Sequence, residues 1–90
     1  MSTQVQALVV GAGISGLTAA YALQKSGIST LLVEACPRPG GAIQTLYRDG
    51  FLLECGPQSF SGNAGLHAIC DELGLLDQRL FADSKAPRYV

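Results

Sequence analysis

Gly11-Ala12-Gly13-Ile14-Ser15-Gly16 lies between a short apolar run and a segment with helical spacing. The run before it, residues 5–10, is nearly all apolar, as in a strand buried on both faces of a parallel sheet. Residues 14–25 after it are rich in Ala and Leu and favour a helix. Residues 30–34 repeat the strand pattern, so residues 1–34 are expected to form one βαβ unit with a right-handed crossover.

In a dinucleotide site, each glycine of this loop has a distinct structural role. Gly11 permits the tight turn, Gly13 lets the backbone approach a pyrophosphate, and Gly16 lets the helix pack close to the strand. The helix N-terminus offers N–H groups and a positive dipole end to phosphates. Glu34 follows Gly16 by 18 residues, where its carboxylate can accept ribose hydroxyls and repel a 2′-phosphate.

The βαβ unit therefore predicts a site for an ADP-containing dinucleotide. FAD and NAD both fit the unit, since they share the ADP half. The alternative is a close-packed turn without a ligand, in which Glu34 is a solvated charge at the end of a strand.

The second half of the chain reads as a hairpin and a helix. Two prolines and two glycines mark residues 36–41 as a loop. Asp49-Gly50 is a type I′ turn signal between strands expected at residues 43–48 and 51–54. Residues 66–73 carry an apolar stripe at helical spacing.

The expected fold class is α/β, with an incomplete doubly wound sheet. Its parts are a Rossmann-like βαβ unit (1–34), a Gly-Gly loop and β-hairpin (35–56), and a loop, a short helix and the start of a further strand at residues 88–90 (57–90).

Composition excludes several classes of protein. Six Lys and Arg residues oppose seven Asp and Glu residues, and no stretch is basic, so no nucleic-acid partner is expected. No apolar run approaches the roughly 20 residues of a membrane span. The N-terminus shows neither a signal peptide nor a transit pattern, which favours the cytoplasm. Three widely spaced cysteines fit free thiols.

No catalytic or metal-binding residue can be assigned from the sequence. His67 and Cys70 offer at most two ligands, so no metal site is expected. We find no set of Ser, His and acid residues that would make a nucleophilic triad. Any chemistry would then be carried by the cofactor, while the protein supplies position and electrostatics.

Residues 34–41, Glu34-Ala35-Cys36-Pro37-Arg38-Pro39-Gly40-Gly41, resemble a motif of the FAD-dependent amine oxidase superfamily, E-A-x-x-R-x-G-G. Asp49-Gly50-Phe51 and residues 54–60 and 86–90 are similar to the oxygen-dependent protoporphyrinogen oxidases of plastids and cyanobacteria. The resemblance runs from residue 5 to residue 90 and implies that the dinucleotide is FAD. The superfamily usually has Arg after the paired glycines, where this chain has Ala42.

The resemblance implies a set of FAD contacts. They are Gly11, Ala12, Gly13, Ile14, Ser15 and Gly16 for the pyrophosphate; Glu34, with Ala35 beside it, for the adenosine ribose; Arg38, Gly40, Gly41 and Ala42 along the pyrophosphate and ribityl path; and Gly56, Pro57, Gln58 and Ser59 near the flavin. From the residues alone, the Gly-Gly pair is also a plausible anion nest with a positive partner in Arg38. An ordinary Pro-Gly loop, and an ordinary turn at Gly56, are the alternatives.

In that family, FAD oxidises protoporphyrinogen IX to protoporphyrin IX with O2, in haem and chlorophyll biosynthesis. The resemblance implies this activity, with a porphyrinogen substrate, for the full-length protein only. Family members often sit peripherally on membranes. The 90-residue chain is expected to be inactive alone, because one βαβ unit leaves sheet faces and edges exposed.

Two alternatives to this function remain open. One is a portion of another FAD-dependent oxidoreductase, such as a carotenoid desaturase or an amine oxidase. The other is a non-enzymatic truncated paralogue that self-associates through its unfinished sheet edge.

Overall fold

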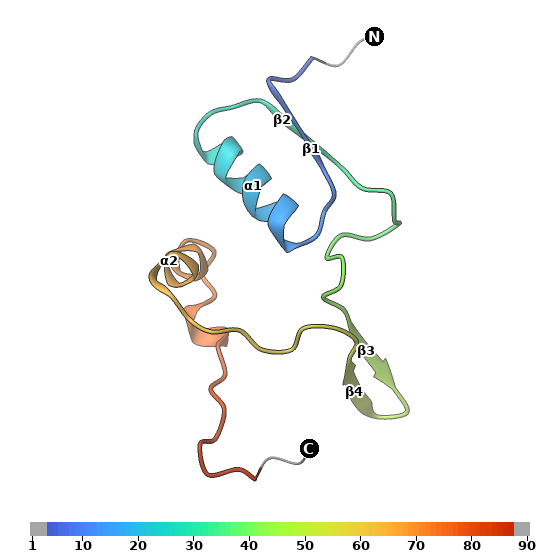
Figure 1. Cartoon of the computed structure of the whole chain (residues 1–90), viewed down its shortest axis with the longest axis vertical. Coiled ribbons are helices and arrows are strands. Elements are labelled where there is room, and N and C mark those ends of the chain that lie inside the picture. The colour runs from blue at the N-terminus through green and yellow to red at the C-terminus, as the bar shows by residue number, and fades with distance from the viewer. Residues whose placement is uncertain (1–3, 88–90) are drawn as a thin grey trace. The chain divides into compact units, whose positions relative to one another are not determined.

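The computed structural model describes residues 4–87 (Figure 1). Contacts divide the chain into two compact units, Met1–Ser59 and Phe60–Val90. Helices and strands are both present, and each unit is described by itself.

The first unit begins with two parallel strands joined by a helix. Strand β1 (Ala7–Val10) pairs with β2 (Thr30–Val33), with Ala7 opposite Thr30. Helix α1 (Ile14–Lys25) connects them and spans the predicted residues (Figure 1). Both strands are shorter than the apolar runs that predicted them.

Helix α1 ends because Gly27 adopts a left-handed conformation with φ of 79°. The N–H of Gly27 donates to the carbonyl of Gln24, and the N–H of Ile28 donates to that of Leu23, each at 3.0 Å. These two bonds form a Schellman motif, which satisfies carbonyls that the last turn leaves open. The chain is thereby turned back toward β2.

A β-hairpin follows the parallel pair. Strands β3 (Thr45–Arg48) and β4 (Phe51–Glu54) are antiparallel, with Arg48 opposite Phe51. Asp49 and Gly50 have φ values of 53° and 81°, as the predicted type I′ turn requires.

The second unit contains helix α2 (Ala64–Glu72) and a short 3₁₀ helix, η1 (Leu76–Gln78). Helix α2 begins two residues before the predicted stripe, because the side chain of Asn63 accepts the N–H of Leu66 at 2.8 Å. Gly74, with φ of 70°, ends the helix region in a second Schellman motif. The sequence did not predict η1, and the strand expected at residues 88–90 lies outside the described residues.

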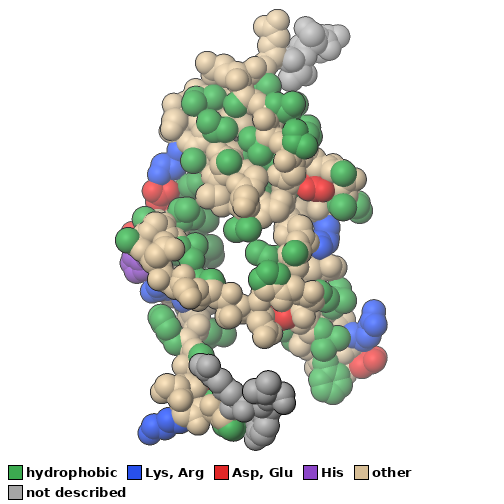
Figure 2. Space-filling model, in the orientation of Figure 1, with side chains coloured by type: hydrophobic (Ala, Val, Ile, Leu, Met, Phe, Trp, Pro, Cys, Tyr) green, Lys and Arg blue, Asp and Glu red, His purple; other side chains and the backbone are tan. Residues whose placement is uncertain are grey.

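The expectation that β1 is buried on both faces is wrong for the described residues. Burial alternates along β1, and Leu8 and Val10 are 59% and 78% exposed. The parallel sheet has two strands, so one helix covers only part of it. Figure 2 shows hydrophobic side chains on the visible surface. Ala12, 3% exposed, is the one buried residue in the described part of the chain.

Candidate dinucleotide site

Ala12 joins three segments of the first unit. Its N–H donates to Oε1 of Glu34 at 2.7 Å, and its carbonyl accepts the N–H of Gly40, also at 2.7 Å. The neighbouring N–H of Gly11 donates to the carbonyl of Val33 at 2.8 Å. The glycine loop, the end of β2 and the Gly-Gly loop are therefore fixed around one small buried residue.

The three glycines of the first loop differ in what their missing side chains permit. Gly11 has φ of 103°, which side chains rarely tolerate. A Cβ on Gly16 would overlap the carbonyl oxygen of Gly11, so this glycine allows α1 to approach the loop closely. A Cβ on Gly13 would meet nothing within 4 Å. The space beside Gly13 is thus open to a ligand.

The N-terminus of α1 faces this loop. Gly13 is its N-cap and makes no side-chain capping bond. The first N–H groups of a helix have no intrahelical partners and attract anions. Ile14 and Ser15, in the first turn, have exposed side chains.

Glu34 holds the glycine loop through both of its carboxylate oxygens. Besides the bond from Ala12, Oε2 accepts the N–H of Cys36 at 2.8 Å. These bonds, that from Ala12 foremost, lower the pKa of Glu34 below its usual value. Each oxygen keeps a further lone pair that can accept a hydroxyl. The exposed carboxylate, followed by exposed Ala35, can therefore brace the loop and accept a ribose hydroxyl together.

The Gly-Gly loop is held by Arg38. Its Nη2 donates to the carbonyl of Gly41 at 2.7 Å and to Oε1 of Gln44 at 2.9 Å, and its Nη1 donates to the carbonyl of Pro39 at 3.1 Å. Gly40 and Gly41 have φ values of 112° and 59°. No sequence pattern singled out Gln44.

The Gly-Gly loop also lies against the first loop. A Cβ on Gly41 would stand 3.1 Å from Cα of Gly13. A Cβ on Gly56 would overlap the carbonyl oxygen of Ala42, so Gly56 permits close approach of two chain segments. The remaining predicted residues, Pro57, Gln58 and Ser59, are exposed and follow Gly56 without regular structure.

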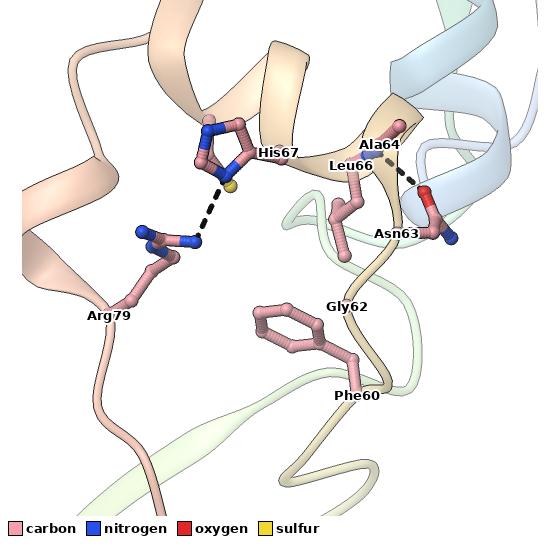
Figure 3. A pocket seen from close by; sticks show the side chains of 8 residues that line it. Phe60, Gly62, Asn63, Ala64, Leu66, His67 and Arg79 are labelled. Atoms are coloured by element: carbon pink, nitrogen blue, oxygen red, sulfur yellow. Dashed lines mark hydrogen bonds between the residues drawn. The ribbon is translucent and has the colours of Figure 1, made fainter.

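The second unit has a pocket of about 340 Å³ (Figure 3). Phe60, Leu66 and Cys70 contribute to its lining, and Nη1 of Arg79 lies 3.2 Å from Nδ1 of exposed His67. Among residues 4–87, no three His, Cys, Asp or Glu side chains gather as they would around a metal ion. The described helices include none with the length and apolar character of a membrane span.

Residues 14–90 match the family model described as flavin containing amine oxidoreductase. The chain belongs to this family. The members of this family contain a flavin. The match therefore confirms the expectation of FAD at the level of the family.

Three relatives of the chain are named as oxidases of a porphyrinogen. The chain is 37% identical over 89 residues to the chloroplastic protoporphyrinogen oxidase of Nicotiana tabacum, covering 99% of the chain and 16% of the relative. It is 46% identical over 87 residues to that of Oryza sativa subsp. japonica, covering 92% and 16%. The coproporphyrinogen III oxidase of Staphylococcus aureus is 35% identical over 85 residues, covering 91% and 18%.

A solved structure of wild-type putrescine oxidase bound to putrescine is also similar. Its TM-score is 0.72 at 45% identity, covering 80% of this chain and 16% of that one. This chain thus spans about 16% of the length of the first relatives and of the solved structure that it matches. The expected resemblance to FAD-dependent amine oxidases and protoporphyrinogen oxidases is confirmed.

Proposed function

We propose that this chain forms the ADP side of an FAD site in a protoporphyrinogen oxidase. The carrying observation is that Ala12 bonds to both Glu34 and Gly40, which draws the predicted ribose and pyrophosphate segments together. The uncapped N-terminus of α1 and the open space at Gly13 fit a pyrophosphate. The arrangement of β1, α1 and β2 is accordingly proposed as the start of a Rossmann-like, doubly wound sheet.

The proposed contacts follow the order of the cofactor. Gly11, Ala12, Gly13, Ile14, Ser15 and Gly16 take the pyrophosphate; Glu34 and Ala35 the ribose; Gly40, Gly41 and Ala42 the pyrophosphate and ribityl path, in a loop that Arg38 holds; Gly56, Pro57, Gln58 and Ser59 the flavin end. FAD, when bound, accepts hydride equivalents from a porphyrinogen. The residues of this chain bind and orient the dinucleotide, and Glu34 disfavours a 2′-phosphate by charge repulsion.

The assignment to protoporphyrinogen oxidases draws on named relatives in tobacco and rice. Putrescine oxidase matches the chain with comparable identity, which supports an amine oxidase as the second candidate. Similar identity to enzymes with different named substrates is expected of a segment that holds the cofactor. We propose that the full-length protein oxidises a porphyrinogen with O2 and that it does so in the cytoplasm. The 90-residue chain is proposed to have no oxidase activity alone.

We propose three segments: a βαβ unit over 1–34, a Gly-Gly loop and hairpin over 35–56, and a loop, a helix and the start of the next strand over 57–90. The exposed apolar residues of β1 and β2, including Leu8 and Val10, need further structure to cover them. Self-association of the free chain through this sheet is the non-enzymatic alternative.

A segment exchange tests the function. Residues 1–90 replace the matching N-terminal segment of the tobacco chloroplastic enzyme, and the rice segment, placed in the same body, is the matched control. We expect both chimaeras to retain about one FAD per chain and to oxidise protoporphyrinogen. An FAD-loaded, active rice chimaera beside a flavin-free chimaera of this chain contradicts the proposal. An FAD-loaded chimaera of this chain that oxidises no protoporphyrinogen, beside an active rice chimaera, favours the amine oxidase.

A further inference from the structure

Arg38 directs both terminal nitrogens of its guanidinium into its own loop. Nη2 donates to the carbonyl of Gly41 and to Oε1 of Gln44, at 2.7 and 2.9 Å. Nη1 donates to the carbonyl of Pro39 at 3.1 Å and reaches that of Ile43 at 3.5 Å. Arg38 is half-buried, and all four acceptors lie within six positions of it.

This arrangement leaves Arg38 poorly placed to grip a phosphate. A guanidinium clamps phosphate through two parallel N–H groups, and each such edge includes a terminal nitrogen. Both terminal nitrogens already bond to loop oxygens. A direct phosphate contact would therefore have to break bonds that hold the loop.

The same bonds determine where the Gly-Gly loop can reach. Gly40 and Gly41 both have positive φ, a backbone that is flexible unless something fixes it. Arg38 bonds to the carbonyl of Gly41, and the N–H of Gly40 bonds to Ala12 at 2.7 Å. Ala12 in turn donates to Glu34. Hydrogen bonds thus connect Gln44 through Arg38, the two glycines and Ala12 to Glu34.

We propose that Arg38 and Gln44, called here the Arg38 brace, are positioning residues for the dinucleotide. The brace fixes the Gly-Gly loop so that Gly40 meets Ala12, and it holds two glycine loops in one arrangement before the cofactor arrives. Gln44 contributes the side-chain acceptor that fixes the second N–H of Nη2. The role of the brace in binding rests on the function proposed above, whereas its hold on Gly40 does not.

The test reads hydrogen exchange of the Gly40 amide in the 90-residue chain without nucleotide, and then titrates the chain with ADP. Gln44→Ala removes the side-chain acceptor of Arg38, and Gln44→Glu keeps an acceptor there. Arg38→Lys keeps the positive charge but lacks the two terminal guanidinium nitrogens. Gln78→Ala, at an exposed position of the second unit, is the control.

We expect Gln44→Ala and Arg38→Lys to speed Gly40 exchange by about fivefold or more and to weaken ADP binding by roughly three- to tenfold. Gln44→Glu and the control should stay near the unmodified chain. The double variant Arg38→Lys/Gln44→Ala should be no worse than either single variant, since both break one network.

Two results separate the failures. If Gln44→Ala leaves Gly40 exchange and ADP affinity unchanged while Arg38→Lys keeps most of the affinity, Arg38 contacts phosphate through its charge and the brace is wrong. If the unmodified chain binds no ADP but Gly40 exchange responds as expected, the brace holds the loop and the dinucleotide function fails.

Discussion

The carboxylate of Glu34 accepts the backbone N–H of Ala12 at 2.7 Å, across 22 positions of the chain. The bond joins the end of β2 to the glycine loop that precedes α1. An acid at this position is expected to hold a ribose, and here it also holds the loop that we propose for the phosphates. One side chain thus joins the segments proposed for the ribose and for the pyrophosphate.

Glu34→Gln tests this coupling through pH. Because N–H bonds lower the folded pKa of Glu34, their stabilisation is fully present above the unfolded pKa and is lost as pH falls through the folded pKa. The difference in unfolding free energy between the chain and Glu34→Gln should therefore shrink on acidification from pH 7 to about pH 3. Denaturant unfolding at both values measures it. A difference that grows on acidification would show that these bonds do not favour the ionised form.

Gly16→Ala should destabilise the chain by about 1–3 kcal/mol, because the new methyl group would overlap the carbonyl of Gly11. Gly62→Ala is the matched control, since a Cβ there meets nothing within 4 Å. The unfolding free energy, measured with denaturant, compares the two. Equal stability of both variants would mean that α1 does not need this close approach.

Gly13→Ala should leave the fold intact and weaken ADP binding by about tenfold. A methyl group at Gly13 enters open space in the protein, at the place proposed for the pyrophosphate. The measurement is the dissociation constant of ADP beside the unfolding free energy. Unchanged ADP affinity in a folded variant would place the nucleotide elsewhere.

Asn63→Ala should destabilise the second unit by about 0.5–2 kcal/mol, since Asn63 caps α2 through the N–H of Leu66. Asn63→Ser, which keeps a capping oxygen, should restore most of the loss. Amide exchange along α2 reports the change. If Asn63→Ala accelerated amide exchange more in β1 than in α2, the effect of the substitution would not be local to the cap.

Local signals predicted most of the elements. The composition and helical spacing of residues 14–25 predict α1, and Asp49-Gly50 predicts the hairpin turn. The apolar stripe at residues 66–73 does not predict the start of α2, because Asn63 caps the helix ahead of the stripe. Burial of β1 was overestimated because an apolar run does not say what covers it.

The residues proposed for the site follow from the sequence, whereas the hydrogen bonds among them do not. Spacing pointed to Glu34 and to the glycines, whose tertiary neighbours no pattern states. The bond from Gly40 to Ala12 spans two loops whose approach depends on the whole unit. Gln44 was missed because a lone amide beside a strand carries no signal of its own; its place beside Arg38 gives it a role.

The most direct test of the central claim is a titration of the isotope-labelled 90-residue chain with ADP, followed through its backbone amide signals. The account predicts saturable shifts at Gly13, Ile14, Ser15 and Gly16 and at Glu34, and much weaker binding of an ADP analogue that carries a 2′-phosphate. Absence of shifts in the glycine loop at millimolar ADP, or equal binding of the 2′-phosphate analogue, would contradict it.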